Sequence, residues 1–183
     1  MSATATCFAR SRSAGRGDVI HDINNQSEKP GYGYQLAQGA TALTEAWNAR
    51  RTSSHNHFML GQITEWFYRD LAGLGSDPEA PGFKRAIVRP QPVSGITWAR
   101  ASHESPRGRI VSAWKRTAGR FELEVEIPAN VSATVFVPTS DPDGVTEGAE
   151  SAADRPGIRR LRVESGVAVY AVESGRYSFS APF

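Results

Sequence analysis

Cysteine is almost absent from this sequence, because Cys7 is the single one among 183 residues. One thiol cannot form an intrachain disulfide, and a zinc or iron–sulfur site built from cysteines is excluded for the same reason. The sequence also lacks a Gly-x-Ser-x-Gly motif, the usual mark of a serine hydrolase of the α/β type. Nothing therefore indicates nucleophilic catalysis by serine or cysteine, and nothing requires an oxidising compartment.

Long apolar runs and clusters of one charge are missing as well. No run approaches the roughly 18 to 20 apolar residues that cross a bilayer, and the N-terminal region lacks the apolar centre of a secretory signal. The 21 Lys and Arg residues barely exceed the 19 Asp and Glu residues and are spread along the chain. The sequence therefore contains no basic cluster of the kind that binds nucleic acid or an anionic membrane. We expect a soluble, cytoplasmic protein that has neither as a partner.

The composition is that of a globular chain with a real core, at 39% hydrophobic and 22% charged residues. Residues 1–14 are rich in Ser and Arg and contain no acidic residue, which predicts a disordered N-terminus. Residues 15–29 then place Val19, Ile20 and Ile23 at helical spacing and stop at Pro30. The first ordered element is therefore expected to be the end of a helix.

Further helical signals follow. Residues 31–39 carry three glycines and predict a tight turn before a short helix. From Asn56 a strong amphipathic helix is expected to run to Gly73 or Gly75, with a broad apolar stripe whose large aromatic members should be buried. The stripe consists of Met59, Ile63, Trp66, Phe67 and Leu71. A segment rich in Gly and Pro, 73–82, marks the end of the helical part.

Beyond that segment the hydrophobic period changes from 3.6 to 2. Residues 121–127 alternate without a fault, and 131–137 repeat the pattern after a Pro-Ala-Asn turn, which predicts an antiparallel hairpin. A polar loop is expected at 141–157. Short strands separated by turns indicate a β-sandwich. The other expected strands are 83–89, 96–103, 109–116, 158–163, 167–172 and 176–179.

One short stretch concentrates the chemistry, since it holds Glu45, Trp47, His55, Asn56 and His57. A carboxylate that moves a proton, an indole face that stacks on a pyranose and polar groups that fix hydroxyls are the mixture of a sugar site. The alternative is a glutamate on a solvated helix face and a tryptophan in a core. The two histidines lack a third ligand or a carboxylate-rich pattern, so we expect no metal and no cofactor.

Four blocks in series resemble the C-terminal end of bacterial α-L-rhamnosidases of glycoside hydrolase family 78. Their order and spacing are similar to those of the family from about residue 15 to the C-terminus. A single GAT-x-x-x-E-x-W match would be weak, whereas four blocks are specific. The blocks are GYGYQLAQGATALTEAW (31–47), SHNHFMLGQITEWFYRDLAGL (54–74), DPEAPGFKRAIVRPQPV (77–93) and WARASHESPRGRIVSAWKR (98–116).

The resemblance implies a fold that is α+β by segments: two or three helices from the end of an (α/α)6 barrel, followed by an antiparallel β-sandwich. Its expected limits are a disordered N-terminus at 1–14, an incomplete set of barrel helices at 15–75 and the sandwich at 76–183. It also implies hydrolysis of terminal α-L-rhamnose with inversion. Glu45 matches the family's general base, His57 after Asn56 matches a histidine that contacts the sugar, and Trp47 would line the pocket.

The main departure from the family is that no counterpart exists for the upstream barrel, where the general acid of the family lies. An inverting hydrolase needs both carboxylates, and the loss of acid assistance alone costs roughly 10² to 10⁴ in rate. We therefore expect a chain that is inactive alone. Its partners would be a rhamnose-containing carbohydrate and either the missing part of the barrel or a second copy of the chain covering its exposed helices.

A second hypothesis is a non-catalytic carbohydrate-binding β-sandwich with a helical cap. Surface aromatics would carry the binding, and the candidates are Trp98, Trp114 and His103. The competing interpretation places Trp98 and Trp114 as packing residues between the sandwich and the helices. The two hypotheses predict different sensitive residues: Glu45 and His57 in the first, and Trp98 or Trp114 in the second.

Overall fold

The computed structural model describes residues 11, 15–48, 50, 52–153 and 155–183. The segment expected to be disordered, 1–14, lies outside them apart from Ser11. The chain forms two compact units, residues 1–67 and 68–183. The division falls earlier than the boundary expected at residue 75. Within the described residues, no helix is both long enough and apolar enough to cross a membrane.

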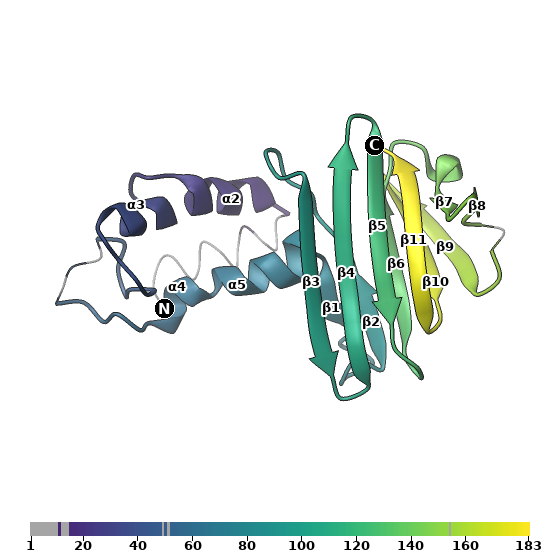
Figure 1. The fold of residues 1–183 in the computed structure, drawn as a ribbon, viewed down its shortest axis with the longest axis horizontal. Coiled ribbons are helices and arrows are strands. Elements are labelled where there is room, and N and C mark those ends of the chain that lie inside the picture. The colour runs from purple at the N-terminus through teal and green to yellow at the C-terminus, as the bar shows by residue number, and fades with distance from the viewer. Residues whose placement is uncertain (1–10, 12–14, 49, 51, 154) are drawn as a thin grey trace. The chain divides into compact units, whose positions relative to one another are not determined.

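The first unit is helical (Figure 1). In α2, Ile20 is fully buried, as its helical spacing predicts. The amphipathic helix expected from Asn56 forms as consecutive pieces, with the buried Ile63 and Trp66 on its apolar stripe. Its last turn is a π-helix, η1, which crosses the division between the units. The helices are α2 (Gly17–Asn25), α3 (Tyr32–Ala37), α4 (Phe58–Gly61), α5 (Ile63–Trp66) and η1 (Phe67–Leu71).

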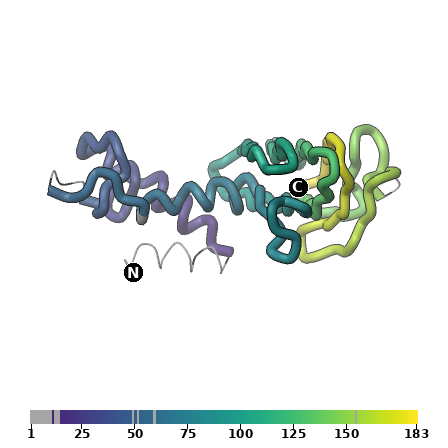
Figure 2. The backbone as a smooth tube through the Cα atoms, turned by 90° about the horizontal axis from the view of Figure 1, so that it is seen from below, coloured from purple at the N-terminus to yellow at the C-terminus, as the bar shows by residue number. Residues whose placement is uncertain are grey.

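The second unit is a β-sandwich of two sheets, which Figure 2 shows as layers seen along the strands. The five-stranded sheet has the order β1-β2-β6-β10-β9, and the six-stranded sheet has the order β3-β4-β5-β11-β7-β8. The strands are β1 (Leu74–Ser76), β2 (Arg85–Val88), β3 (Trp98–Ser105), β4 (Gly108–Thr117), β5 (Arg120–Ile127), β6 (Ser132–Pro138), β7 (Thr146–Glu147), β8 (Glu150–Ser151), β9 (Ile158–Glu164), β10 (Val167–Val172) and β11 (Gly175–Pro182), and a short 3₁₀ helix, η2 (Pro142–Gly144), precedes β7.

The core of the sandwich follows from the period of two along its strands. In β5 the side chains of Phe121, Leu123 and Val125 are buried, while the intervening glutamates lie on the outer face of the sheet. The rings of Tyr170 and Phe179, one from each sheet, stack at 5.6 Å between centroids and fill the space between the layers. The expected fold class, helices followed by an antiparallel sandwich, is thus confirmed.

The expected hairpin between 121–127 and 131–137 is wrong. β5 pairs with β4 and β11 in one sheet, whereas β6 pairs with β2 and β10 in the other. The turn between them therefore carries the chain across the sandwich, and Asn130 adopts a positive φ of 61° there. Both strands present an apolar face to the core, so alternation alone cannot distinguish two paired strands from two strands that face each other.

Two further features of the sandwich differ from what the sequence predicts. β2 and β6 pair in parallel, in the register Arg85↔Ser132 to Val88↔Val135. The region expected to be a polar loop, 141–157, contains the two-residue strands β7 and β8 at the edge of the six-stranded sheet. These strands are too short to produce a visible hydrophobic period.

The end of η1 is bonded to the sandwich by side chains from β4. The indole Nε1 of Trp114 donates to the carbonyl of Leu71 at 2.7 Å, and the hydroxyl of Ser112 donates to the carbonyl of Ala72 at 2.6 Å. Both donors are buried. Carbonyls at the end of a helix have no partner within it, so these two bonds satisfy groups that would otherwise be buried unpaired.

Candidate functional site

The candidate residues lie on a loop that connects α3 to α4 and is closed by two backbone hydrogen bonds. The amide of His57 donates to the carbonyl of Leu43 at 3.1 Å, and the amide of Glu45 donates to the carbonyl of Ser54 at 2.9 Å. The chain thus leaves and returns at the same place. We call this segment, residues 43–57, the closed loop.

A buried polar cluster fixes the start of the closed loop to α3. The amide Nε2 of Gln35 donates to the hydroxyl of Thr44 at 2.6 Å, and that hydroxyl donates to the carbonyl of Ala46 at 2.7 Å. Gln35 is 3% exposed and Thr44 is fully buried. Since buried polar groups are costly unless they are bonded, this cluster holds Glu45 between two fixed neighbours.

Tyr32 supports the loop from the same face of α3. Its ring meets the indole of Trp47 edge-on, with centroids 5.0 Å apart and planes at 86°, and its hydroxyl donates to the carbonyl of Leu60. Burial raises the pKa of Tyr32. Sequence reasoning missed Tyr32 and Gln35 as supporting residues, although their i, i+3 spacing in a helix places them side by side.

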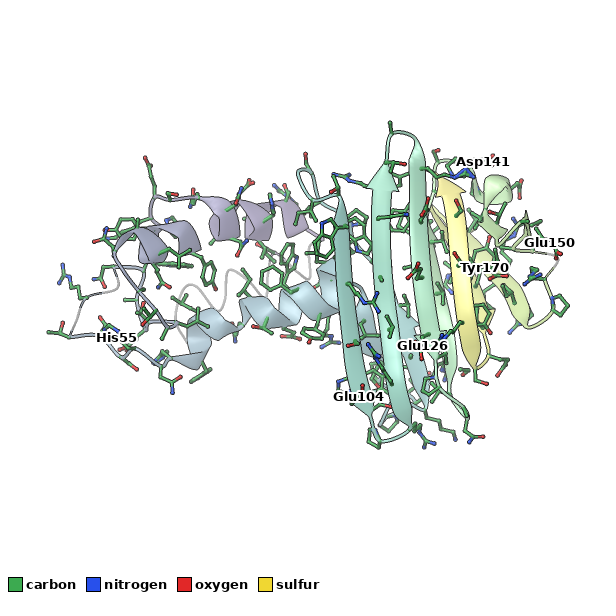
Figure 3. All side chains as sticks on the ribbon, in the orientation of Figure 1. His55, Glu104, Glu126, Asp141, Glu150 and Tyr170 are labelled. Carbon is green, nitrogen blue, oxygen red and sulfur yellow. The ribbon has the colours of Figure 1, made fainter. Side chains whose placement is uncertain are left out.

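The structure brings all four predicted site residues onto the closed loop. Glu45 and Asn56 are exposed, and Trp47 and His57 are half-buried. The ring of His57 stacks on Phe58 with centroids 5.5 Å apart. His55, labelled in Figure 3, lies on the same loop, and its Nε2 is 3.1 Å from the carbonyl of Arg50. The roles assigned to these residues stay predictions.

A hollow of about 400 Å³ lies beside the start of the closed loop. None of Glu45, Trp47, Asn56 and His57 is among its described lining residues. The wall is largely apolar and includes Leu36, which is 72% exposed. Its lining consists of Tyr32, Gln35, Leu36, Ala40, Thr41, Ala42 and Leu43.

Among the described residues, no group of three or more His, Cys, Asp or Glu side chains could hold a metal ion. In the closed loop and the helices beside it, residues 31–62, Glu45 is the only acidic residue. The arrangement can therefore supply one carboxylate, an indole, an imidazole and a carboxamide, but not a pair of carboxylates.

The three aromatics of the alternative hypothesis differ in their exposure. Trp114 is 2% exposed and its ring stacks on Phe121, so it belongs to the core. His103 is half-buried, with its ring centroid 4.6 Å from that of Phe83. Trp98 is 67% exposed at the start of β3. Of the three, Trp98 is the most exposed.

Two family models match this chain and meet near the end of η1. Residues 4–71 match the bacterial α-L-rhamnosidase 6 hairpin glycosidase domain, and residues 73–152 match the bacterial α-L-rhamnosidase C-terminal domain. Both matches are to parts of one kind of enzyme, and they follow each other in the order of the helical and β units.

Curated relatives and solved structures agree with these models. An α-L-rhamnosidase of Streptomyces avermitilis is 30% identical over 177 residues, which is 91% of this chain and 16% of the relative. One of Alteromonas sp. is 36% identical over 134 residues, 68% of this chain and 14% of the relative. The chain therefore spans less than one fifth of the length of either protein.

Among solved structures, the Streptomyces avermitilis α-L-rhamnosidase complexed with L-rhamnose superposes with a TM-score of 0.83 at 28% identity, covering 97% of this chain and 17% of that one. The α-L-rhamnosidase from Dictyoglumus thermophilum gives 0.85 at 31% identity, covering 99% and 20%. The helices followed by a β-sandwich in this chain are thus an arrangement found in glycosidases. More narrowly, the chain belongs to the bacterial α-L-rhamnosidase family and corresponds to its C-terminal portion.

Proposed function

We propose that this chain supplies the C-terminal portion of an inverting α-L-rhamnosidase that removes terminal α-L-rhamnose from glycosides. Glu45 acts as the general base, and Trp47, Asn56 and His57 bind the sugar. The observation that carries the proposal is the closed loop, which holds all four side chains on one segment fixed at both ends. A catalytic group needs such fixation, because misplacement by even 1 Å can cost about 10²-fold in rate.

The chemistry assigns one step to each side chain. The carboxylate of Glu45 accepts a proton from water as that water attacks the anomeric carbon from the face opposite the leaving group. The amide of Asn56 and the imidazole of His57 bind sugar hydroxyls, while the half-buried indole of Trp47 covers an apolar face of the ring. The backbone amide of Glu45 donates to the carbonyl of Ser54, so the loop's closure holds the backbone from which the carboxylate extends.

The second carboxylate of an inverting pair stands roughly 6.5 to 9.5 Å from the base. The closed loop provides none, and the chain covers only part of its relatives. The general acid and most of the pocket wall therefore come from residues outside this sequence, and the chain alone does not hydrolyse rhamnosides. Its partners are a rhamnose-containing carbohydrate and the remainder of the hairpin domain, or a second copy that covers the same helices.

The proposal is tested by grafting the chain onto the Streptomyces avermitilis α-L-rhamnosidase in place of the aligned C-terminal segment. We expect the graft to release rhamnose from an aryl α-L-rhamnoside with inversion, observed by NMR of the first anomer formed. Glu45→Gln should lower kcat by about 10² to 10⁴, since a positioned proton acceptor contributes that much. The chain alone should show no hydrolysis.

Glu28→Gln is the matched control, because Glu28 is an exposed carboxylate of the same unit. It should leave kcat unchanged. The assignment of Glu45 is wrong if a folded graft, checked by circular dichroism, keeps its rate after Glu45→Gln. Hydrolysis by the isolated chain would contradict the proposal that the general acid comes from residues outside this sequence.

A further inference from the structure

The outer face of the six-stranded sheet contains a hollow that no catalytic role explains. It has a volume of about 240 Å³ and lies over β3, β4 and β5, on the face whose other end carries Glu104 and Glu126 in Figure 3. Pockets for drug-sized ligands span about 300 to 1,000 Å³, so this one suits a single ring. It is lined by Trp98, Ala99, Arg100, Ala113, Trp114, Lys115, Glu122, Glu124 and Ser178.

The strand register explains why a hollow forms there. Arg100 lies opposite Ala113, and Ala113 lies opposite Glu124, so a methyl group stands between two long side chains. In the next row Trp98 lies opposite Lys115. Cross-strand neighbours stand about 5 Å apart, and the small residue therefore forms a floor surrounded by an indole, a guanidinium, an ammonium and a carboxylate.

The side chains around this floor are available to a ligand. Trp98 is 67% exposed, so its indole is accessible to a ligand from solvent. In the part of the chain that the structure describes, Arg100 forms no ion pair and Glu124 forms no side-chain hydrogen bond. Lys115 is held by Glu122 at 2.8 Å, which fixes one wall of the hollow.

The charges of the hollow identify the kind of ligand. Arg100 and Lys115 are balanced by Glu122 and Glu124, so a polyanion or polycation gains nothing there. A neutral sugar ring with one apolar face and several hydroxyls complements these side chains. The indole of Trp98 stacks on the C–H face, while the guanidinium of Arg100 and the carboxylate of Glu124 form hydrogen bonds with hydroxyls. The hollow continues into a second one of about 450 Å³ that shares Arg100, Glu124 and Ser178, which gives room for a following sugar unit.

We propose that this face is a saccharide-binding site for a neutral pyranose, with Trp98 as the stacking platform and Arg100 and Glu124 as hydroxyl ligands. The site goes beyond the proposed hydrolase function and does not depend on Glu45. It would hold a glycan chain on the sandwich while another part of the enzyme cleaves it.

The test uses the full chain labelled with ¹⁵N, whose four tryptophans each give one indole N–H resonance. L-rhamnose and D-galactose are titrated separately, and sorbitol serves as an open-chain polyol without a ring face. We expect the Trp98 resonance, assigned by its loss in Trp98→Phe, to shift saturably with either sugar at a Kd on the order of 1 to 10 mM. Sorbitol should not shift it.

Substitutions test whether Trp98 and Arg100 themselves bind the sugar. Followed through the backbone amide resonances of β3–β5 in the same spectra, Trp98→Ala and Arg100→Ala should each weaken binding at least about tenfold, and Trp98→Phe only about threefold, because a smaller ring still stacks. Arg107→Ala, an exposed arginine of the β3–β4 turn, is the matched control and should change nothing.

Four results would overturn the site: no saturable shift with either sugar, an equal response to sorbitol, a shift confined to Trp47 that Glu45→Gln removes, or a Trp98→Ala variant that loses self-association rather than sugar binding. The last would make the face a protein contact. Because the graft assay monitors Glu45 and the titration monitors Trp98, failure of one proposal leaves the other testable.

Discussion

Tyr32 is the residue whose environment makes the clearest solution prediction. Burial raises its pKa, and its hydroxyl donates to the carbonyl of Leu60. A group with a raised folded-state pKa contributes stability that is complete below its unfolded value of about 10 and is lost as the pH rises through the folded value. The free energy of unfolding should therefore fall above about pH 10.

Tyr32→Phe removes both the titration and the bond. We expect the variant to be less stable by about 1 to 2 kcal/mol near neutral pH, since a buried carbonyl loses its donor, and to lose less stability than the native chain above about pH 10. Urea unfolding followed by tryptophan fluorescence measures both. Tyr68→Phe, at a position where the ring is 44% exposed, is the control; equal alkaline slopes for all three proteins would contradict the assignment.

The individual residues of the candidate site were partly predictable from the sequence. The clustering of Glu45, Trp47, Asn56 and His57 is local, so a linear pattern reveals it. The closure of the loop depends on the bonds of Leu43 and Ser54 and on the buried contact of Gln35. These use backbone groups and a neutral amide, which leave no periodic or charged signal in the sequence.

Among the elements, the entry into β1 depends on one glycine. Gly73 has a φ of +78°, and a Cβ at this position would lie 2.1 Å from the backbone nitrogen of Pro90. Its carbonyl accepts the amide of Arg89 at 2.7 Å. Any side chain would therefore meet both an unfavourable backbone conformation and a rigid neighbour.

We expect Gly73→Ala to lower the free energy of unfolding by more than about 3 kcal/mol, or to prevent folding of the five-stranded sheet. Gly75→Ala is the matched control two residues away: nothing lies within 4 Å of the added Cβ, so the change should stay within about 1 kcal/mol. Thermal unfolding by circular dichroism compares them. Equal melting temperatures would show that the backbone shifts to accept the methyl group.

Strands were easier to predict than their partners. The alternation of apolar and polar residues along β5 and β6 reflects burial on one face of each strand. It can therefore be read from the residues of each strand alone. The choice of neighbours reflects the whole sandwich: β6 lies between β2 and β10, and β11 lies between β5 and β7. A rule that joins consecutive strands fails wherever the chain crosses between layers, as it does after β5.

For the molecule as a whole, the first unit presents apolar side chains that it does not bury. Leu36 is 72% exposed and Phe58 is 78% exposed. We expect the isolated chain to self-associate through them, because such surface is otherwise covered in monomeric proteins. Leu36→Ser with Phe58→Ser should lower the mass measured by light scattering towards 19.8 kDa.

The matched control for association is Leu161→Ser with Val163→Ser, on β9 of the other unit, where the residues are 37% and 51% exposed. This pair should leave the mass unchanged. A monomeric native chain, or a mass that only the β9 pair lowers, would contradict the assignment of the associating surface to the helices.

The order of strands in the six-stranded sheet bears on how the protein is made. β11 pairs with β5 along Gly175↔Ile127 to Pro182↔Arg120 and with β7 on its other side. Among the strands that the structure describes, β11 is synthesised last, so the edge of β5 that pairs with it stays open while the more than forty residues between the two strands are added. Until β11 pairs with it, that edge is a ready template for wrong strand pairing in the nascent chain.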